Sequence, residues 1–212
     1  MTCDWNGSEV AFRVAADEQT DDVLQVLDEA AGWLGARGIT QWPARFEAEW
    51  VAEAIARGET WLIGVGGRVA GTITLDWEDP LWTDLGGSAG YVHRMAVRRW
   101  AAGLGVVMLG WASDAARHRG ADALRLDCVS SNARLRAYYE ARGFVHRGDV
   151  AVGGAPGCGC GRRPWAAAGR RTCHLGEPVR TRLVGRLTVT VTAIRRWLRS
   201  ALLLRRGRWA WA

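Results

Sequence analysis

The amino-acid sequence predicts an α/β protein of the α+β kind, with a mixed, mostly antiparallel sheet of six to seven strands flanked by about four helices. Three observations predict it. Alternating and amphipathic segments follow one another in the order β-α-α-β-β-β-α-β-α-β. The residues Gly66-Gly67-Arg68 form a tight turn that makes the two strands around them antiparallel. The strand–helix–strand unit over residues 91–129 favours one parallel crossover.

The first half of the chain supplies three strands and two helices. Residues 10–15 alternate in polarity as a strand does, and Asp21 and Asp22 place negative charge where a helix begins. That helix continues with apolar residues at helical spacing until the glycines at 35 and 38. A second helix is expected between Pro43 and Gly58. Two strands follow, over residues 60–65 and 69–75.

The second half continues with alternating strands and helices. A fourth strand is expected over residues 91–97 and a helix over 103–119. Residues 123–129 are largely apolar, as expected for a strand that is covered on both faces. A helix over 133–142 ends at Gly143, which suits a left-handed C-cap, and a sixth strand begins at Phe144.

Composition excludes several classes of protein. Hydrophobic residues make up 49% and charged residues 24%, values typical of a globular chain, so wholesale disorder is excluded. The apolar runs are too short to span a bilayer. The N-terminus has no basic start and no apolar core typical of a signal peptide. We therefore expect a cytoplasmic protein.

The charge of the chain is divided unevenly. The formal net charge is +6, and all 28 basic residues are arginines. Residues 1–156 carry a net charge of −6, whereas residues 157–212 carry +12. This division predicts a main domain over residues 1–152 and a basic extension, rich in Arg, Gly and Trp, over residues 153–212.

The extension contains two patterns after a loop over residues 153–182. Residues 187–192 alternate strictly, so they predict a late strand that would be the seventh of the sheet. Residues 194–206 fit an amphipathic helix with arginines on one side, a pattern found in segments that bind nucleic acid or an anionic membrane. The alternative is an appendage without ordered structure.

The cysteines favour free thiols over a metal site. Five cysteines are an odd number for a disulfide framework, and a cytosolic chain keeps its thiols reduced. Cys158, Cys160, Cys173 and His174 offer four zinc ligands, but a one-residue spacing and an adjacent Cys-His pair fit poorly with zinc knuckles. We therefore expect no metal.

A glycine-containing turn suggests a phosphate site. The strand over residues 91–97 leads through Arg98 and Arg99 into Gly103-Leu104-Gly105 and then directly into a helix. Glycines let a ligand approach the backbone closely, and the N–H groups at a helix start favour phosphate. Taken alone, the same residues also fit an ordinary tight turn.

A second block follows the fifth strand: Asn132, then Tyr138-Tyr139-Glu140, then Gly143-Phe144. Together with the strand YVHRMAV and the GLG turn, it resembles the GNAT superfamily of acyl-CoA-dependent N-acyltransferases over about residues 8–150. A Tyr four residues before Gly-Phe is a frequent ending of that family's last core helix. The segment WLGARGITQW is similar to one bacterial branch of the superfamily. The resemblance implies that residues 1–152 form a GNAT-like acetyltransferase domain.

One position departs from the family pattern. The phosphate loop of the family usually begins with Arg or Gln three residues before its first Gly, and here that position is Trp100. Arg98 or Arg99 is the candidate for the missing charge. The affinity for acetyl-CoA is the property that this departure would affect.

The resemblance implies acetyl-CoA as co-substrate and a set of residues that bind it. The main chain at Ala96 and Val97 would pair with the pantetheine arm, residues 103–106 would hold the pyrophosphate, and Asn132 would contact the CoA arm or the helix start. The expected CoA-binding residues are Ala96, Val97, Arg98, Arg99, Gly103, Leu104, Gly105, Val106, Asn132 and Tyr138.

The resemblance also implies catalytic roles. Tyr139 would be the general acid for the leaving thiolate, because a phenol with a pKa near 10 is a credible proton source; the alternative is a ring packed beside Tyr138. His93 would be the base, since a pKa near 6.5 suits proton collection at neutral pH. A structural histidine is the alternative there. Asp76 and Glu78 are the competing pair, as a base or as a site for a cationic amine.

The acceptor pocket is expected between the first two helices and the loop after the third strand. That region offers aromatic walls and carboxylates, which suit an amine with a hydrophobic or cationic part. Its candidate residues are Trp33, Trp42, Trp77, Trp82, Asp76, Glu78, Asp79 and Asp84.

The sequence thus predicts an N-acetyltransferase that acts on the primary amine of a small molecule. A non-catalytic acyl-CoA-binding module and a nucleic-acid- or membrane-associated protein that acts through its extension are the alternatives. We also consider a homodimer as the oligomeric state.

Overall fold

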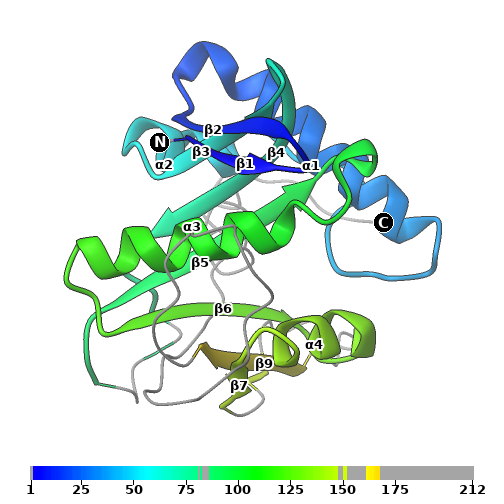
Figure 1. The fold of residues 1–212 in the computed structure, drawn as a ribbon. Coiled ribbons are helices and arrows are strands. Elements are labelled where there is room, and N and C mark those ends of the chain that lie inside the picture. The colour runs from blue at the N-terminus through cyan, green and yellow to red at the C-terminus, as the bar shows by residue number, and fades with distance from the viewer. Residues whose placement is uncertain (1, 81, 83–85, 148–149, 152–160, 168–212) are drawn as a thin grey trace, which may run out of the picture.

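The computed structural model describes residues 2–80, 82, 86–147, 150–151 and 161–167. Within these residues one sheet of nine strands has the order β1-β2-β3-β4-β5-β6-β9-β7, with β8 paired to β9. Only β5 and β6 are parallel among the described strand pairs. The elements, shown in Figure 1, are β1 (Thr2–Trp5), β2 (Ser8–Val14), η1 (Asp17–Gln19), α1 (Thr20–Gly35), α2 (Glu49–Ala56), β3 (Thr60–Val65), β4 (Arg68–Asp76), β5 (Ala89–Val97), η2 (Arg99–Ala101), α3 (Gly105–His118), β6 (Ala123–Val129), α4 (Ala133–Glu140), β7 (Phe144–His146), β8 (Val150–Ala151) and β9 (Gly161–Ala167).

The predicted mixed fold is confirmed, and three strands are added to it. Strand β1 pairs with β2 through the turn at Asn6 and Gly7, both of which have positive φ. Asn-Gly is a strong hairpin signal, although no strand was expected before residue 10. Strand β9 occupies residues 161–167, where a loop was expected, and lies between β6 and β7. The predicted strand 187–192 and helix 194–206 lie outside the described residues.

Two hydrophobic cores cover the two faces of the sheet. Helix α3 packs on one face, where Met108 and Trp111 join Ile63 of β3 and Leu124 of β6. Helices α1 and α2 pack on the other face, where Leu62 belongs to their core. Residues 62 and 63 therefore point to opposite faces, as a strand requires. No helix among the described residues is long and apolar enough to cross a membrane.

The sheet opens between β5 and β6. Their parallel pairing runs from Ala89 opposite Ala123 to Val92 opposite Leu126 and is not continued beyond these residues. On its other side β5 stays paired with β4, but the register shifts between Thr72 and Thr74. A β-bulge of this kind bends a strand and re-aims its side chains. Residues 93–97 of β5 therefore form an edge inside the molecule.

Candidate active site

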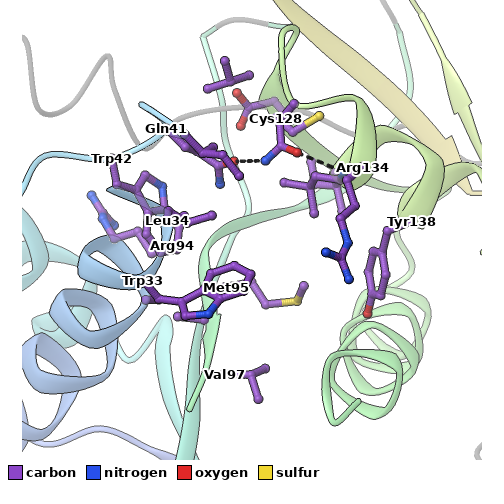
Figure 2. Close-up of a pocket in the computed structure, with 18 of the residues that line it drawn as sticks. Trp33, Leu34, Gln41, Trp42, Arg94, Met95, Val97, Cys128, Arg134 and Tyr138 are labelled. Atoms are coloured by element: carbon purple, nitrogen blue, oxygen red, sulfur yellow. Dashed lines mark hydrogen bonds between the residues drawn. The ribbon is translucent and has the colours of Figure 1, made fainter. Parts of the chain in front are cut away.

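A cavity of about 320 Å³ lies at this opening. Figure 2 shows Trp33, Leu34 and Trp42 on one side of it and Arg134 and Tyr138 on the other. Its wall combines α1, the segment after α1, the bulged half of β5, the end of β6 and α4. The lining residues are Glu29, Ala30, Trp33, Leu34, Arg37, Ile39, Gln41, Trp42, Val92, His93, Arg94, Met95, Ala96, Val97, Arg99, Leu126, Asp127, Cys128, Val129, Asn132, Arg134, Leu135, Tyr138 and Tyr139.

The expected phosphate turn follows directly from β5. Gly103 has a φ of +102°, which L side chains rarely adopt, and Leu104 anchors the turn because it is fully buried. A Cβ atom at residue 105 would lie 2.7 Å from the hydroxyl oxygen of Tyr138. Glycine therefore lets α4 approach the start of α3. Val106 is half exposed, so the turn reaches solvent.

The two arginines before the turn are held by α1. Arg98 Nη1 lies 2.7 Å from Glu29 Oε2, and the backbone N–H of Arg99 donates to Glu29 Oε1 at 3.0 Å. The Arg99 guanidinium lies over the ring of Trp33, 4.3 Å from its centroid. The charge of Arg98 is thus balanced by Glu29, and Arg99 is the one of the two that lines the cavity.

Asn132 joins α4 to the segment after α1. Its Oδ1 atom accepts a hydrogen bond from the N–H of Leu135 at 3.1 Å, which caps the N-terminus of α4. Its Nδ2 atom donates to Gln41 Oε1 at 3.0 Å. Gln41 was not among the predicted residues, because only the folded chain brings it near α4.

The two tyrosines of α4 differ in environment. Tyr139 is only 6% exposed, and its ring contacts those of Tyr138 and Phe144. Burial raises the pKa of Tyr139 well above 10, with smaller contributions from Cys128 and other neighbours, so its hydroxyl keeps its proton. Burial also raises the pKa of Tyr138, opposed by Arg142, whose guanidinium stacks on the Tyr138 ring.

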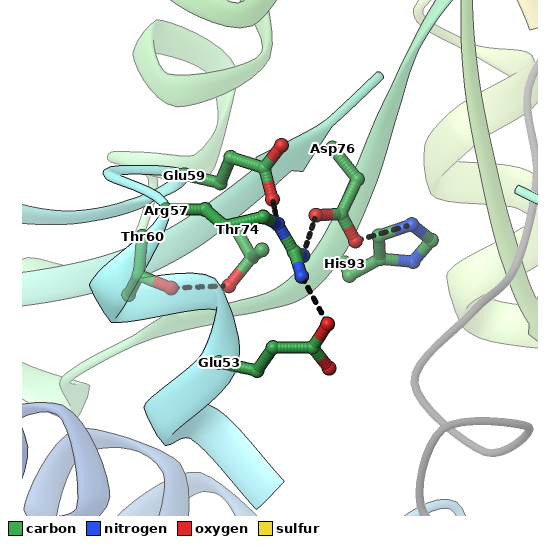
Figure 3. A network of polar contacts seen from close by, with 7 residues as sticks. All are labelled: Glu53, Arg57, Glu59, Thr60, Thr74, Asp76 and His93. Carbon is green, nitrogen blue, oxygen red and sulfur yellow. Dashed lines mark hydrogen bonds and ion pairs between the residues drawn. The ribbon is translucent and has the colours of Figure 1, made fainter. Parts of the chain in front are cut away.

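The two competing base candidates lie side by side. His93 stands opposite Thr74 in the strand register, and Asp76 follows two residues later on the same face of β4. His93 Nε2 lies 3.4 Å from Asp76 Oδ2, and both side chains are buried (Figure 3). Asp76 Oδ1 in turn lies 3.3 Å from an Arg57 nitrogen. Glu53 and Glu59 also pair with Arg57.

The structure places Asp76 and Glu78 in different surroundings. Strand β4 ends at Asp76, so strand alternation does not extend to Glu78, which is exposed. Neither carboxylate lines the cavity. His93 faces the cavity, and Asp76 lies behind it.

The structure brings only some of the expected acceptor residues to the cavity. Trp33 and Trp42 line the cavity, but Trp82 packs with Ala89, Tyr91 and Ala123, and Trp77 lies against Gly90. Asp79 is buried away from the lining, and Asp84 lies outside the described residues. The described lining residues include two carboxylates that were not expected there, Glu29 and Asp127, and four arginines: Arg37, Arg94, Arg99 and Arg134. A bulged strand, which spacing alone does not show, brings Arg94 into the wall.

Ala96, Val97, Arg99, Asn132 and Tyr138 of the predicted CoA-binding set line the cavity, together with His93 and Tyr139. Arg98 and residues 103–106 lie in the turn beyond it and are not part of the lining. Among the described residues, no three His, Cys, Asp or Glu side chains gather as a metal site would. Cys158, Cys160, Cys173 and His174 lie outside those residues.

Comparison with known proteins identifies the family of the chain. The sequence model of the acetyltransferase (GNAT) family matches residues 24–144. The chain is 29% identical over 150 residues to the uncharacterized N-acetyltransferase YesJ of Bacillus subtilis, covering 66% of this chain and 83% of YesJ.

Solved structures share the fold. A GNAT-family acetyltransferase from Listeria monocytogenes is 25% identical, with a TM-score of 0.64 over 78% of this chain and 98% of the other. The PaiA N-acetyltransferase from Thermoplasma acidophilum, in complex with coenzyme A, is 16% identical, with a TM-score of 0.56 over 73% of this chain and 96% of the other. Naa50 of Arabidopsis thaliana, bound to the bisubstrate analogue CoA-Ac-MVNAL, is 17% identical, with a TM-score of 0.51 over 73% of this chain and 95% of the other. With the family model covering more than half of its residues, the chain belongs to the GNAT family of acetyltransferases.

Proposed function

We propose that the protein transfers an acetyl group from acetyl-CoA to the primary amine of a small molecule, without a metal. The observation that carries the proposal is that the open edge of β5, His93 and Tyr139 meet in one cavity. A strand edge, a basic group and a neutral acid are what acyl transfer to an amine requires. The enclosing walls from Trp33 and Trp42 favour a small acceptor.

The edge of β5 fits the pantetheine arm of CoA. An extended chain with amide groups can pair with an open strand as a further strand would. From Ala96 and Val97 the arm would lead to the turn over residues 103–106, where the start of α3 offers N–H groups to the pyrophosphate. Arg99 and Arg134 add positive charge to the same cavity.

His93 and Tyr139 would divide the two proton transfers. The amine nitrogen attacks the thioester carbonyl, a C–N bond forms, and the nitrogen gives its proton to His93. The C–S bond then breaks, and the leaving thiolate takes a proton from the Tyr139 hydroxyl. Asp76 would orient the imidazole from behind without touching the substrate.

Thiol release tests this proposal. The protein is mixed with acetyl-CoA and a panel of primary amines, and free CoA is measured with a thiol reagent. His93→Gln should lower kcat/KM at least about 100-fold, because the amine loses its proton acceptor. His118→Gln is the matched control, since His118 is exposed at the end of α3 and should leave the rate unchanged.

A second measurement separates this proposal from its alternative. If calorimetry shows CoA binding while no amine releases thiol, the chain is a non-catalytic acyl-CoA-binding module. If His93→Gln keeps the parent rate, the histidine is a structural residue and the base lies elsewhere.

The context of the reaction is also a proposal. We expect a cytoplasmic enzyme with an acidic catalytic domain over residues 1–152 and a basic extension over residues 153–212. The charges of −6 and +12 on the two sides of residue 157 support the division. Gel filtration distinguishes a monomer from a homodimer, and salt-dependent retention on heparin or anionic vesicles tests a polyanion-binding role for the extension.

A further inference from the structure

The charge of the acceptor side is opposite to the sequence-based expectation. Asp76, Glu78 and Asp79 do not line the cavity, whereas Arg37 and Arg94 do. Glu29 and Asp127 line it as well, and the two oxygens of Glu29 already hold Arg98 and the Arg99 backbone. The lining therefore carries four arginines against two carboxylates. A wall of this kind disfavours a second cation on the acceptor and favours an anion.

Arg94 adopts an unusual backbone conformation. Its φ is +47°, and the only other described non-glycine residue with positive φ is Asn6, in a hairpin turn where Asn is expected. A long side chain at such a φ strains the backbone, and residues of this kind cluster at functional sites. Glycine or asparagine would form the same bulge at lower cost, so the side chain of Arg94 calls for a reason of its own.

The side chain of Arg94 is buried and yet reaches the cavity. The residue is only 5% exposed, yet it lines the cavity, on the side of Leu34 and Trp42 in Figure 2. A guanidinium stays charged when buried and carries five N–H donors, more than one partner usually satisfies. It can therefore receive a ligand in addition to its contacts with the protein.

Arg94 belongs to the reacting end of the cavity. It directly follows His93, whereas the turn that would hold the pyrophosphate begins nine residues after it. Strand residues rise about 3.3 Å each, so the phosphates of CoA would lie well away from Arg94. The thioester and the amine would lie beside it.

We propose, resting on the proposed function, that the acceptor carries a carboxylate that Arg94 binds while its amine faces His93. The planar guanidinium fork matches a carboxylate with two parallel hydrogen bonds. The acceptor is then an aminocarboxylate, such as an amino acid. The rings of Trp33 and Trp42 offer an apolar surface to a side chain of the acceptor.

Matched acceptors test this inference. Thiol release from acetyl-CoA is compared for phenylalanine, phenylalaninamide and 2-phenylethylamine, and for glycine against methylamine. The carboxylate-bearing acceptor of each set should have the higher kcat/KM, by about 100-fold. If the amines without a carboxylate reacted equally well or better, the proposal of an aminocarboxylate acceptor would be overturned.

Arg94→Gly is the decisive variant, because glycine accepts a φ of +47° and the bulge should persist. It should raise KM for the aminocarboxylate about 100-fold and leave the matched amine and the CoA affinity within about threefold. Arg94→Lys keeps the charge without the fork and should recover part of the preference. An equal loss for both acceptors, or weakened CoA binding, would overturn the role. Absence of thiol release with every amine would instead overturn the proposed function itself.

Discussion

Replacing Tyr139 with Phe removes one hydroxyl from a buried ring and leaves its packing against Phe144 in place. The proposed acid is then missing, and turnover should fall about 10²–10⁴-fold. The CoA dissociation constant should stay within about twofold, because pairing with β5 does not involve this hydroxyl. Loss of turnover with retained CoA binding is the expected pattern.

The same variant has a second signature at high pH. Burial raises the pKa of Tyr139 well above its ordinary value of 10, so the folded protein keeps the phenol neutral while the unfolded chain ionises it. The stability that this neutral phenol contributes is present below pH 10 and is lost as the pH rises beyond it. At pH 11 the parent protein should therefore show this loss of stability. Tyr139→Phe should not suffer it.

Urea unfolding of parent and variant at pH 8 and pH 11 measures this difference, beside steady-state kinetics and calorimetry with CoA. Tyr138→Phe is the matched control: its ring is less buried and its hydroxyl lies over Gly105, so turnover should change less than in Tyr139→Phe. If Tyr139→Phe keeps turnover within a factor of two, Tyr139 is a packing residue. If Tyr138→Phe shows the larger loss, the neighbouring tyrosine is the acid.

Substitutions at Gly103, Arg57 and Asn132, each with a control, probe the rest of the site. Gly103→Ala forces a side chain into a φ of +102° and should cost about 1–3 kcal/mol of stability and weaken CoA binding. Gly32→Ala in α1, with open space around it, should instead raise stability slightly; melting curves and calorimetry report both. Arg57→Gln removes the charge beside Asp76 and should lower kcat about tenfold with unchanged CoA affinity. Arg57→Lys should recover part of the lost kcat. An unchanged kcat would show that Asp76 does not depend on this contact. Asn132→Ala removes the cap of α4 and should cost about 1 kcal/mol by urea unfolding, while Asn132→Asp keeps the accepting oxygen and should cost less.

Much of the fold could be predicted from local pattern. The strand over residues 123–129 has the predicted bounds, because its apolar run and its flanking turns agree. Strand β9 could not be found in this way. Its residues include Pro164 and do not alternate, and their extended form accompanies pairing with β6 and β7.

The site was predictable to the extent that its residues stand in short blocks. Tyr139 and Asn132 could be placed because α4 and its cap are local features. The position of Asp76 behind His93 depends on the register of β4 against β5, and that register is shifted by a bulge. The same bulge turns Arg94 into the cavity wall. Cross-strand register and backbone outliers are properties of the folded chain, so sequence spacing does not show them.

Hydrogen exchange with and without CoA tests most directly the claim that the opening between β5 and β6 is the active site. If the pantetheine arm pairs with β5 and the pyrophosphate binds the turn, CoA should slow amide exchange in peptides that cover residues 93–97 and 103–106. Peptides from α2, none of whose residues line the cavity, should exchange at the same rate in both samples. Saturating CoA that leaves residues 93–97 unprotected, or protects another part of the chain instead, would contradict the account.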